Sequence, residues 1–245
     1  PDMALAVTPL RIDKLAVLFA LIFLIAAALN VIYAWRIGDR VQDSSGLMYA
    51  GAGVGGALAG DLVTLFVFWE IAAVSSVFLV LAGGTRAAFR ASMRYLCVQV
   101  LSGLLLLAGV VMMGAEGRSL GFERMALTDA AGAIDLAALA IFLAFGIKVA
   151  FPFLHNWLQD AYPKASVAGA VILSAFTTKL AVYALARGFP GTEPLIYIGA
   201  AMTAFPVFFA LIENDLRKVL AYSLNNQVGF MVCAIGIGTP VALNG

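Results

Sequence analysis

The stretch "AFGIKVAFPFLHNW", residues 144–157, places a lysine, a proline and the chain's single histidine at the end of an apolar run. An ammonium group in hydrocarbon costs ~3 to ~10 kcal/mol or more unless it finds a partner or water. Pro152 follows Lys148 by four residues and weakens the same helix, because proline lacks an N–H and its ring clashes with the carbonyl four residues earlier. Unwound backbone at membrane depth is tolerated where it lines a water-filled cavity. We therefore predict a membrane helix that breaks around Pro152 beside a charged, hydrated site.

The composition around this stretch is that of an all-α, polytopic membrane protein. Hydrophobic residues make up 63% of the chain and charged residues 12%, and the mean hydropathy is +1.00. A net charge of +1 argues against a nucleic-acid partner, which needs a surplus of clustered Lys and Arg. Cys97 and Cys233 each lie alone in an apolar run, as small buried residues do, so we expect no disulfide.

The apolar runs predict about eight transmembrane helices, since ~20 residues cross a ~30 Å hydrocarbon core. Asp61 divides one overlong run into a short glycine-rich helix, whose glycines would let neighbouring backbones approach closely, and a second helix. We expect one transmembrane domain over residues 1–245, the central part of a longer chain, because both ends of the sequence look cut. The expected spans are 12–35, the glycine-rich helix before residue 61, 62–82, 92–113, 134–151 broken near its end, 166–187, 194–212 and 216–238.

The cations in the connections predict the orientation. With eight crossings, eight Lys and Arg residues fall on one side and five on the other. The positive-inside rule places the richer side in the cytoplasm, so we expect a multi-pass protein of the cell inner membrane. The richer side holds Arg36, Arg40, Arg86, Arg90, Arg94, Lys164, Arg217 and Lys218, and the other side holds Arg11, Lys14, Arg118, Arg124 and Arg187.

Three charges remain inside the spans: Glu70, Lys148 and Lys179. Two lysines and one glutamate do not pair one to one, so one lysine must become neutral, lie in water or share the carboxylate. Burial favours the neutral form of an amine and a nearby carboxylate favours the charged form. A movable Glu70 would let Lys148 take up and release a proton, as in a proton relay. The alternative is structural: the Glu–Lys pair ties two helices together, and a lysine near a span end snorkels to the interface.

His155 ionises in a range suited to passing protons, and we include it as a candidate relay residue. The alternative is a histidine that is only hydrogen-bonded in a polar turn. One histidine without a neighbouring cysteine argues against a metal site, and we expect no cofactor. Asn225, Asn226 and Gln227 are adjacent amides in the last span, so at least one should face other helices or water.

Three stretches together resemble one known family. They are "LFVFWEIAAVSSVFLVLAG" (65–83), "KVAFPFLHNWLQDAYPKASVAGAVILSAFTTKLAVYALARG" (148–188) and "DLRKVLAYSLNNQVGFM" (215–231). This pattern resembles the proton-translocating, antiporter-like membrane subunits shared by Mrp-type cation/proton antiporters and respiratory complex I. The resemblance covers nearly the whole chain and implies a fold of about fourteen helices built from inverted five-helix repeats, each with a broken helix.

The resemblance also implies roles for single residues. Glu70 matches the family's glutamate, which modulates the broken-helix lysine matched by Lys148. Lys179 matches the lysine of the following helix, and His155 matches a histidine in the loop of the broken helix. The family's "WLPDAH" reads "WLQDAY" here, with Gln159 in place of a proline, a form more like the D-type subunit of Mrp antiporters.

Three functions follow from these observations. The first is a proton-conducting subunit of a multisubunit Na+ or K+/proton antiporter, working with other membrane subunits. The second is the same module in complex I (NADH-quinone oxidoreductase) or a membrane-bound hydrogenase. No flavin, iron–sulfur or quinone motif is present in the sequence, so redox centres would belong to partner subunits. The third is a structural membrane subunit whose buried charges only fix helix packing.

Overall fold

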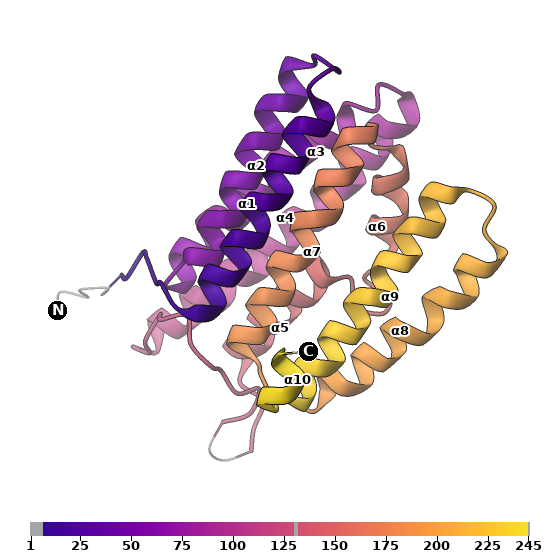
Figure 1. Ribbon diagram of the computed structural model, residues 1–245. Helices are drawn as coiled ribbons and strands as arrows, with labels where there is room; N and C mark the ends of the chain where they lie inside the picture. The colour runs from indigo at the N-terminus through magenta and orange to yellow at the C-terminus, as the bar shows by residue number, and fades with distance from the viewer. Residues whose placement is uncertain (1–6, 130–131, 245) are drawn as a thin grey trace.

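The computed structural model describes residues 7–129 and 132–244, and the regular structure of these residues is helical apart from isolated bridges (Figure 1). This confirms the all-α membrane fold. The elements are α1 (Lys14–Ala34), α2 (Arg40–Leu58), α3 (Leu62–Leu81), α4 (Arg86–Ala115), α5 (Leu136–Val149), α6 (Asn156–Ala161), a 3-10 turn η1 (Tyr162–Lys164), α7 (Val167–Gly188), α8 (Pro194–Ile212), α9 (Leu216–Ile237) and α10 (Pro240–Asn244).

Side-chain caps explain where many of these helices begin. A side-chain oxygen just before a helix accepts a bond from one of its first free amides. Asp61 does this for α3, accepting from the amide of Thr64 at 2.7 Å, and so divides the overlong apolar run as the sequence predicted. Asp39 does the same for α2, which therefore starts at Arg40 and is 19 residues long rather than short. The other side-chain caps are Asp13, Thr85, Asp135, Ser166 and Asp215.

Six helices in the described part of the chain are long and apolar enough to cross a membrane. They are α1, α3, α4, α7, α8 and α9. The apolar helix α5 is shorter, with 14 residues, because the span that contains it is broken and continues as α6. With α2 and this broken span, the order of segments matches the eight that the sequence predicts.

Successive helices run in alternating directions, and α1, α2, α3, α4 and α5 each pack on the next (Figure 1). The connections 35–39, 82–85, 165–166 and 213–215 lie at one end of the bundle, which we call the arginine-rich side. The helices α8 and α9 form an antiparallel hairpin that packs on α7 through α9. The charge grouping read from the sequence is therefore the grouping that the fold produces.

The glycine-rich helix α2 packs differently from the prediction. An added Cβ at Gly53 would collide with the ring of Phe176, and one at Gly55 with the ring of Phe68. These glycines therefore make room for aromatic side chains rather than for neighbouring backbones. Close backbone approach occurs instead between α8 and α9, where a Cβ at Gly199 would meet the backbone of Cys233. The large rings on the facing helices explain the difference.

The two cysteines are free, as predicted, but they are not both buried. Cys97 lies on an exposed face of α4, and Cys233 on α9 is half-buried. An apolar run in a membrane helix has a face toward lipid as well as a face toward the bundle, so hydrophobic neighbours along the chain do not imply burial.

The connection between α4 and α5 folds back under the bundle on the side opposite the arginines. Backbone bonds join Leu62 to Leu120 and Phe122 to Gly60, and the Phe122 side chain is fully buried. On this side Arg187 is also buried and donates to Asp13 at 2.8 Å. These contacts close one end of the bundle, below the middle of the membrane spans.

Candidate functional site

The break between α5 and α6 lies where the sequence placed it. The helix α5 ends at Val149, three residues before Pro152, and both Ala150 and Phe153 adopt left-handed backbone angles with φ of 69° and 68°. The carbonyls freed by the break find new donors. The amide of Phe151 bonds Gly146 at 3.0 Å, and the indole N–H of Trp157 bonds Ile147 at 3.0 Å.

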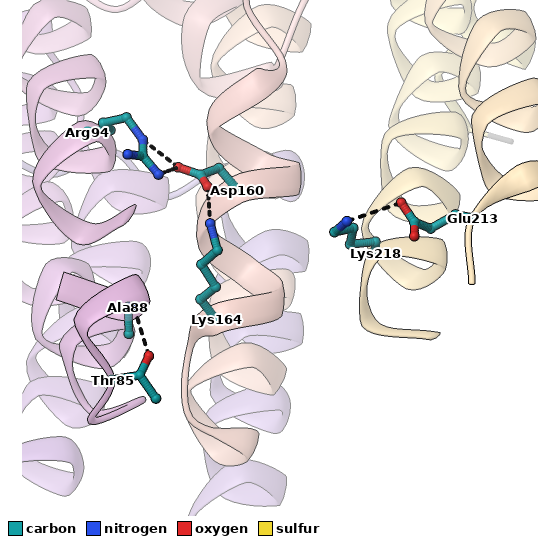
Figure 2. Close-up of polar contacts among 7 residues, drawn as sticks. All are labelled: Thr85, Ala88, Arg94, Asp160, Lys164, Glu213 and Lys218. Atoms are coloured by element: carbon teal, nitrogen blue, oxygen red, sulfur yellow. Dashed lines mark hydrogen bonds and ion pairs between the residues drawn. The ribbon is translucent and has the colours of Figure 1, made fainter. Parts of the chain in front are cut away.

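The helix α6 is held on the arginine-rich side by an ion-pair cluster (Figure 2). Arg94 of α4 donates to Asp160 of α6 through Nε at 2.7 Å, and Lys164 binds the other oxygen of the same carboxylate. The phenol of Tyr162 donates to the carbonyl of Leu173 on α7 at 2.9 Å. The second half of the broken span is thus fastened to both of its neighbours.

Lys148 lies twelve residues, or about 18 Å, along α5 from Leu136, which places it deep within the span. Its residue surface is 1% exposed. The ammonium donates to the backbone carbonyl of Trp69 on α3 at 2.9 Å and lies 4.0 Å from the centre of the Trp69 ring, a cation–π contact. An ammonium has three donors, and this bond uses one of them.

Trp69 is itself held in place by a chain of hydrogen bonds across three helices. Its indole N–H donates to Ser102 of α4 at 3.0 Å, and Ser102 donates to the carbonyl of Ala144 on α5 at 2.8 Å. Since Ala144 is one turn before Lys148, this chain fixes the indole against the lysine. The sequence analysis missed Trp69 and Ser102, because neither residue type stands out in an apolar span.

Glu70 is the next residue after Trp69 and interacts electrostatically with Lys148. The ion pairs among the described residues do not include Glu70, and its Oε1 is buried without a hydrogen-bond partner. That oxygen lies against Gly103 of α4, where a Cβ would overlap it. The structure thus brings Glu70 and Lys148 into one site with the carboxylate unbound.

Lys179 and His155 lie away from this pair. The half-buried Lys179 donates to the carbonyl of Ser174 at 2.9 Å, within its own helix α7. The half-buried His155 lies edge-on to Phe205 of α8, with ring centres 4.6 Å apart, and its Nδ1 has no hydrogen-bond partner. Within the described ranges, the hydrogen bonds of Lys148 and Lys179 run to backbone carbonyls and join neither of these residues to Lys148.

The amide cluster of α9 behaves as predicted. Asn226 donates to the carbonyl of Thr203 on α8 at 2.6 Å, and Asn225 is 1% exposed. Both polar atoms of the Asn225 side chain are without a partner. In residues 7–129 and 132–244, no group of three or more His, Cys, Asp or Glu side chains is placed to hold a metal ion.

A broken transmembrane span with a buried lysine at the break, facing an unbound carboxylate on the next helix but one, defines an antiporter-like membrane subunit. Comparison with known proteins agrees. Residues 59–245 match the family model described as NADH:quinone oxidoreductase/Mrp antiporter, transmembrane. The chain belongs to this family, and it is a multi-pass membrane protein.

The relatives come from both branches of the family. The chain is 33% identical over 208 residues to the D-type Na(+)/H(+) antiporter subunit of Alkalihalophilus pseudofirmus, covering 79% of this chain and 42% of that protein. It is 28% identical over 260 residues to the M-type NADH-quinone oxidoreductase subunit of Escherichia coli, covering 96% and 51%. The chain therefore spans about half the length of these relatives.

Solved structures show the same fold. The Mrp complex from Dietzia sp. contains a chain that matches with a TM-score of 0.83 and 26% identity, covering 96% of this chain and 47% of that one. A chain of respiratory complex I from Thermus thermophilus matches with a TM-score of 0.84 and 23% identity, covering 97% and 55%. At that identity the second match concerns the fold alone.

Proposed function

We propose that this chain carries the proton pathway of a multisubunit Na+ or K+/proton antiporter in the inner membrane of a cell. The observation that carries the proposal is Lys148, an almost fully buried lysine with one hydrogen bond and an unbound carboxylate nearby. A buried ion pair that served only to tie helices together would be expected to have direct, well-satisfied bonds. The Glu70–Lys148 site has neither, which favours a working site over a structural one.

In the proposed mechanism Lys148 is the switching proton carrier and Glu70 controls its charge. A carboxylate that moves toward a buried amine favours the ammonium, and one that moves away favours the neutral amine. Lys179 on α7 passes the proton onward, and His155 is a further relay member at the break. Because no direct bond joins these residues to Lys148 in the described chain, the transfer between them requires water or movement.

The relatives support both the transport and the need for partners. The two proteins named as D-type Na(+)/H(+) antiporter subunits and the chain from an Mrp complex are parts of larger assemblies by name. We infer that this chain works beside other membrane subunits in the lipid bilayer. Since it covers about half of each relative, the activity belongs to the parent protein and its complex.

A second candidate function is proton pumping driven by redox chemistry in partner subunits. The observation that favours it is the likeness to the M-type NADH-quinone oxidoreductase subunit, which covers nearly all of this chain. The same Glu70–Lys148 site would serve either machine, because both need a buried group that binds and releases a proton.

The test uses the parent protein with its partner subunits in inside-out vesicles. Respiration establishes a proton gradient, sodium or potassium is added, and a pH-sensitive dye follows the gradient. We expect the cation to collapse the gradient for the wild type and not for Lys148→Ala. No response of the wild type would support the redox-driven candidate, and equal responses would remove Lys148 from the mechanism.

Two further variants make this test specific. Lys148→Arg should also fail although it keeps the positive charge, because arginine essentially never releases its proton. Lys218→Ala removes a surface lysine whose ion pair is with Glu213 at 3.3 Å (Figure 2). It should transport like the wild type. Assembly of each variant is checked by co-purification with the partner subunits.

A further inference from the structure

A closed cavity lies beside Lys148 where five helices meet, and its polar lining was not part of the predicted site. The space is enclosed and too tight for a water molecule in this structure. Side chains from α2, α3, α4, α5 and α7 surround it. They are Tyr49, Gly53, Ala72, Ser76, Gln99, Lys148, Phe176, Thr177 and Leu180.

Gln99 is the feature of this cavity that needs an explanation. Its residue surface is 0% exposed, and neither the oxygen nor the nitrogen of its amide has a hydrogen-bond partner. Buried polar groups in proteins are almost always bonded to protein or to water, since a dry, unpaired amide is unfavourable. The dry cavity therefore leaves Gln99 unsatisfied, and entry of water would satisfy it.

Two hydroxyl pairs border the cavity. Tyr49 of α2 and Thr177 of α7 are hydrogen-bonded to each other across the interface of their helices. Tyr95 of α4 donates to Ser76 of α3 at 2.9 Å. The first pair is the one that joins α2 to α7, the two helices that also line the nearest open pocket.

That pocket is open to the surroundings and lies between α1, α2, α3 and α7 toward the arginine-rich side. It shares its helix faces with the cavity. Gly46 and Ala50 line the pocket while Tyr49 and Gly53 line the cavity, and Ile172 lines the pocket one turn before Phe176. The pocket also contains unpaired polar atoms of two residues, Asn30 Oδ1 and Gln42 Nε2.

We propose that the Tyr49–Thr177 pair is a gate between this open pocket and the cavity of Lys148. When the pair separates, water enters from the arginine-rich side, bonds the amide of Gln99 and reaches the ammonium. When the pair closes, as in this structure, Lys148 is cut off from that side. The gate rests on the proposed role of Lys148 as a proton carrier, and Gln99 is a positioning residue that holds the water.

The first experiment measures access to the cavity and needs no transport. In the parent complex, with Cys97 and Cys233 replaced by serine, Gln99→Cys is exposed to aminoethyl methanethiosulfonate on the arginine-rich side. Adding Tyr49→Phe or Thr177→Val should speed labelling by about fivefold, the change expected from losing one neutral hydrogen bond. Tyr183→Phe is the matched control, because that buried phenol bonds the carbonyl of Ala57 and does not line the cavity.

Several outcomes would overturn the gate. They are equal labelling with and without the pair, an equal acceleration by Tyr183→Phe, or no reaction at position 99 in any variant. If the Gln99→Cys complex does not assemble, Ser76→Cys takes its place, since Ser76 lines the same cavity.

A transport measurement separates the gate from the proposed function. Gln99→Leu keeps the size of the side chain and removes the amide, so cation-driven proton movement should fall by roughly tenfold, or about 1.4 kcal/mol. Full transport by an assembled Gln99→Leu complex would overturn the gate and leave the role of Lys148 standing. Absence of transport in the wild type would count against the proposed function, while the labelling result would still decide the gate.

Discussion

Lys148 is the residue at which the sequence and the structure meet. A charge in the middle of an apolar run is visible without coordinates, and the structure confirms that this lysine is buried beside Glu70. Its bond to the carbonyl of Trp69 was not predictable, because a backbone acceptor carries no mark in the sequence. The nearness of Gly103 to Glu70 was hidden for the same reason: only the packing of α3 on α4 creates it.

Gly103→Ala tests whether the position of the Glu70 carboxylate matters. The new methyl group would overlap Oε1 of Glu70 and force the carboxylate to move relative to Lys148. We expect transport to fall by roughly tenfold, about 1.4 kcal/mol of lost coupling, with normal assembly. The measurement is the same dye assay in vesicles.

Gly114→Ala is the matched control in the same helix, since no atom lies within 4 Å of its added Cβ. It should leave transport unchanged. If Gly103→Ala transported as well as Gly114→Ala, the carboxylate would not need its present position, and its proposed control of Lys148 would lose support.

Among the helices, the broken span is the element that sets this fold apart from a simple bundle. Pro152 predicts a break, and the helix ends at Val149 because a residue before proline is disfavoured in helical geometry. The left-handed angles at Ala150 and Phe153 cost of order 1 kcal/mol each for residues other than glycine. The bonds of Trp157 and Asp160 offset that cost by fastening α6 to α5 and α4.

Asp135 caps the helix that carries Lys148, and its charge gives a pH-dependent contribution to stability. Burial raises the pKa of Asp135, but bonds from the amide of Ala138 and from Arg118 outweigh it, so the pKa lies below its ordinary value of 3.8. A lowered carboxyl pKa stabilises the folded protein above that value, and the contribution is lost as pH falls through the lowered pKa. Asp135→Ala should therefore destabilise the complex by about 1 kcal/mol at neutral pH and by less in acid.

Thermal unfolding of the purified complex at about pH 7 and about pH 3 measures this difference. Asp43→Ala is the control, because Asp43 is an exposed carboxylate in the first turn of α2 and caps no helix. A loss of stability for Asp135→Ala that was the same at both pH values would mean that the charge of the carboxylate contributes nothing.

Across the complete bundle, the fold sorts the charges onto two sides. The even spacing of the helices brings the connections with eight cations to one end of the bundle, where Arg94 and Lys164 also hold α6. The positive-inside rule predicts that this arginine-rich side faces the cytoplasm. The proposed gate opens toward the same side, so the orientation decides from which compartment it admits protons.

Paired cysteine variants test this orientation in the parent complex, with Cys97 and Cys233 replaced by serine. Ser44 is exposed near the arginine-rich side, and Ser119 is exposed on the opposite side. In inside-out vesicles an impermeant thiol reagent should label Ser44→Cys and spare Ser119→Cys, and intact cells should give the reverse. The opposite pattern would invert the predicted topology and the direction of the gate.

The membrane class, the order of the spans, the break near Pro152 and the three charges within the spans could all be derived from the amino-acid sequence. They follow from hydropathy, proline chemistry and the cost of a charge in hydrocarbon, all of which act along the chain. Coordinates were needed to see that Trp69 binds Lys148, that Gly103 makes room for Glu70, and that Gln99 lies unpaired beside the Tyr49–Thr177 pair. Coordinates were also needed to see that Lys179 and His155 lie apart from Lys148. The physical reason is that these contacts join residues of different helices, whose relative rotation and depth are set by packing.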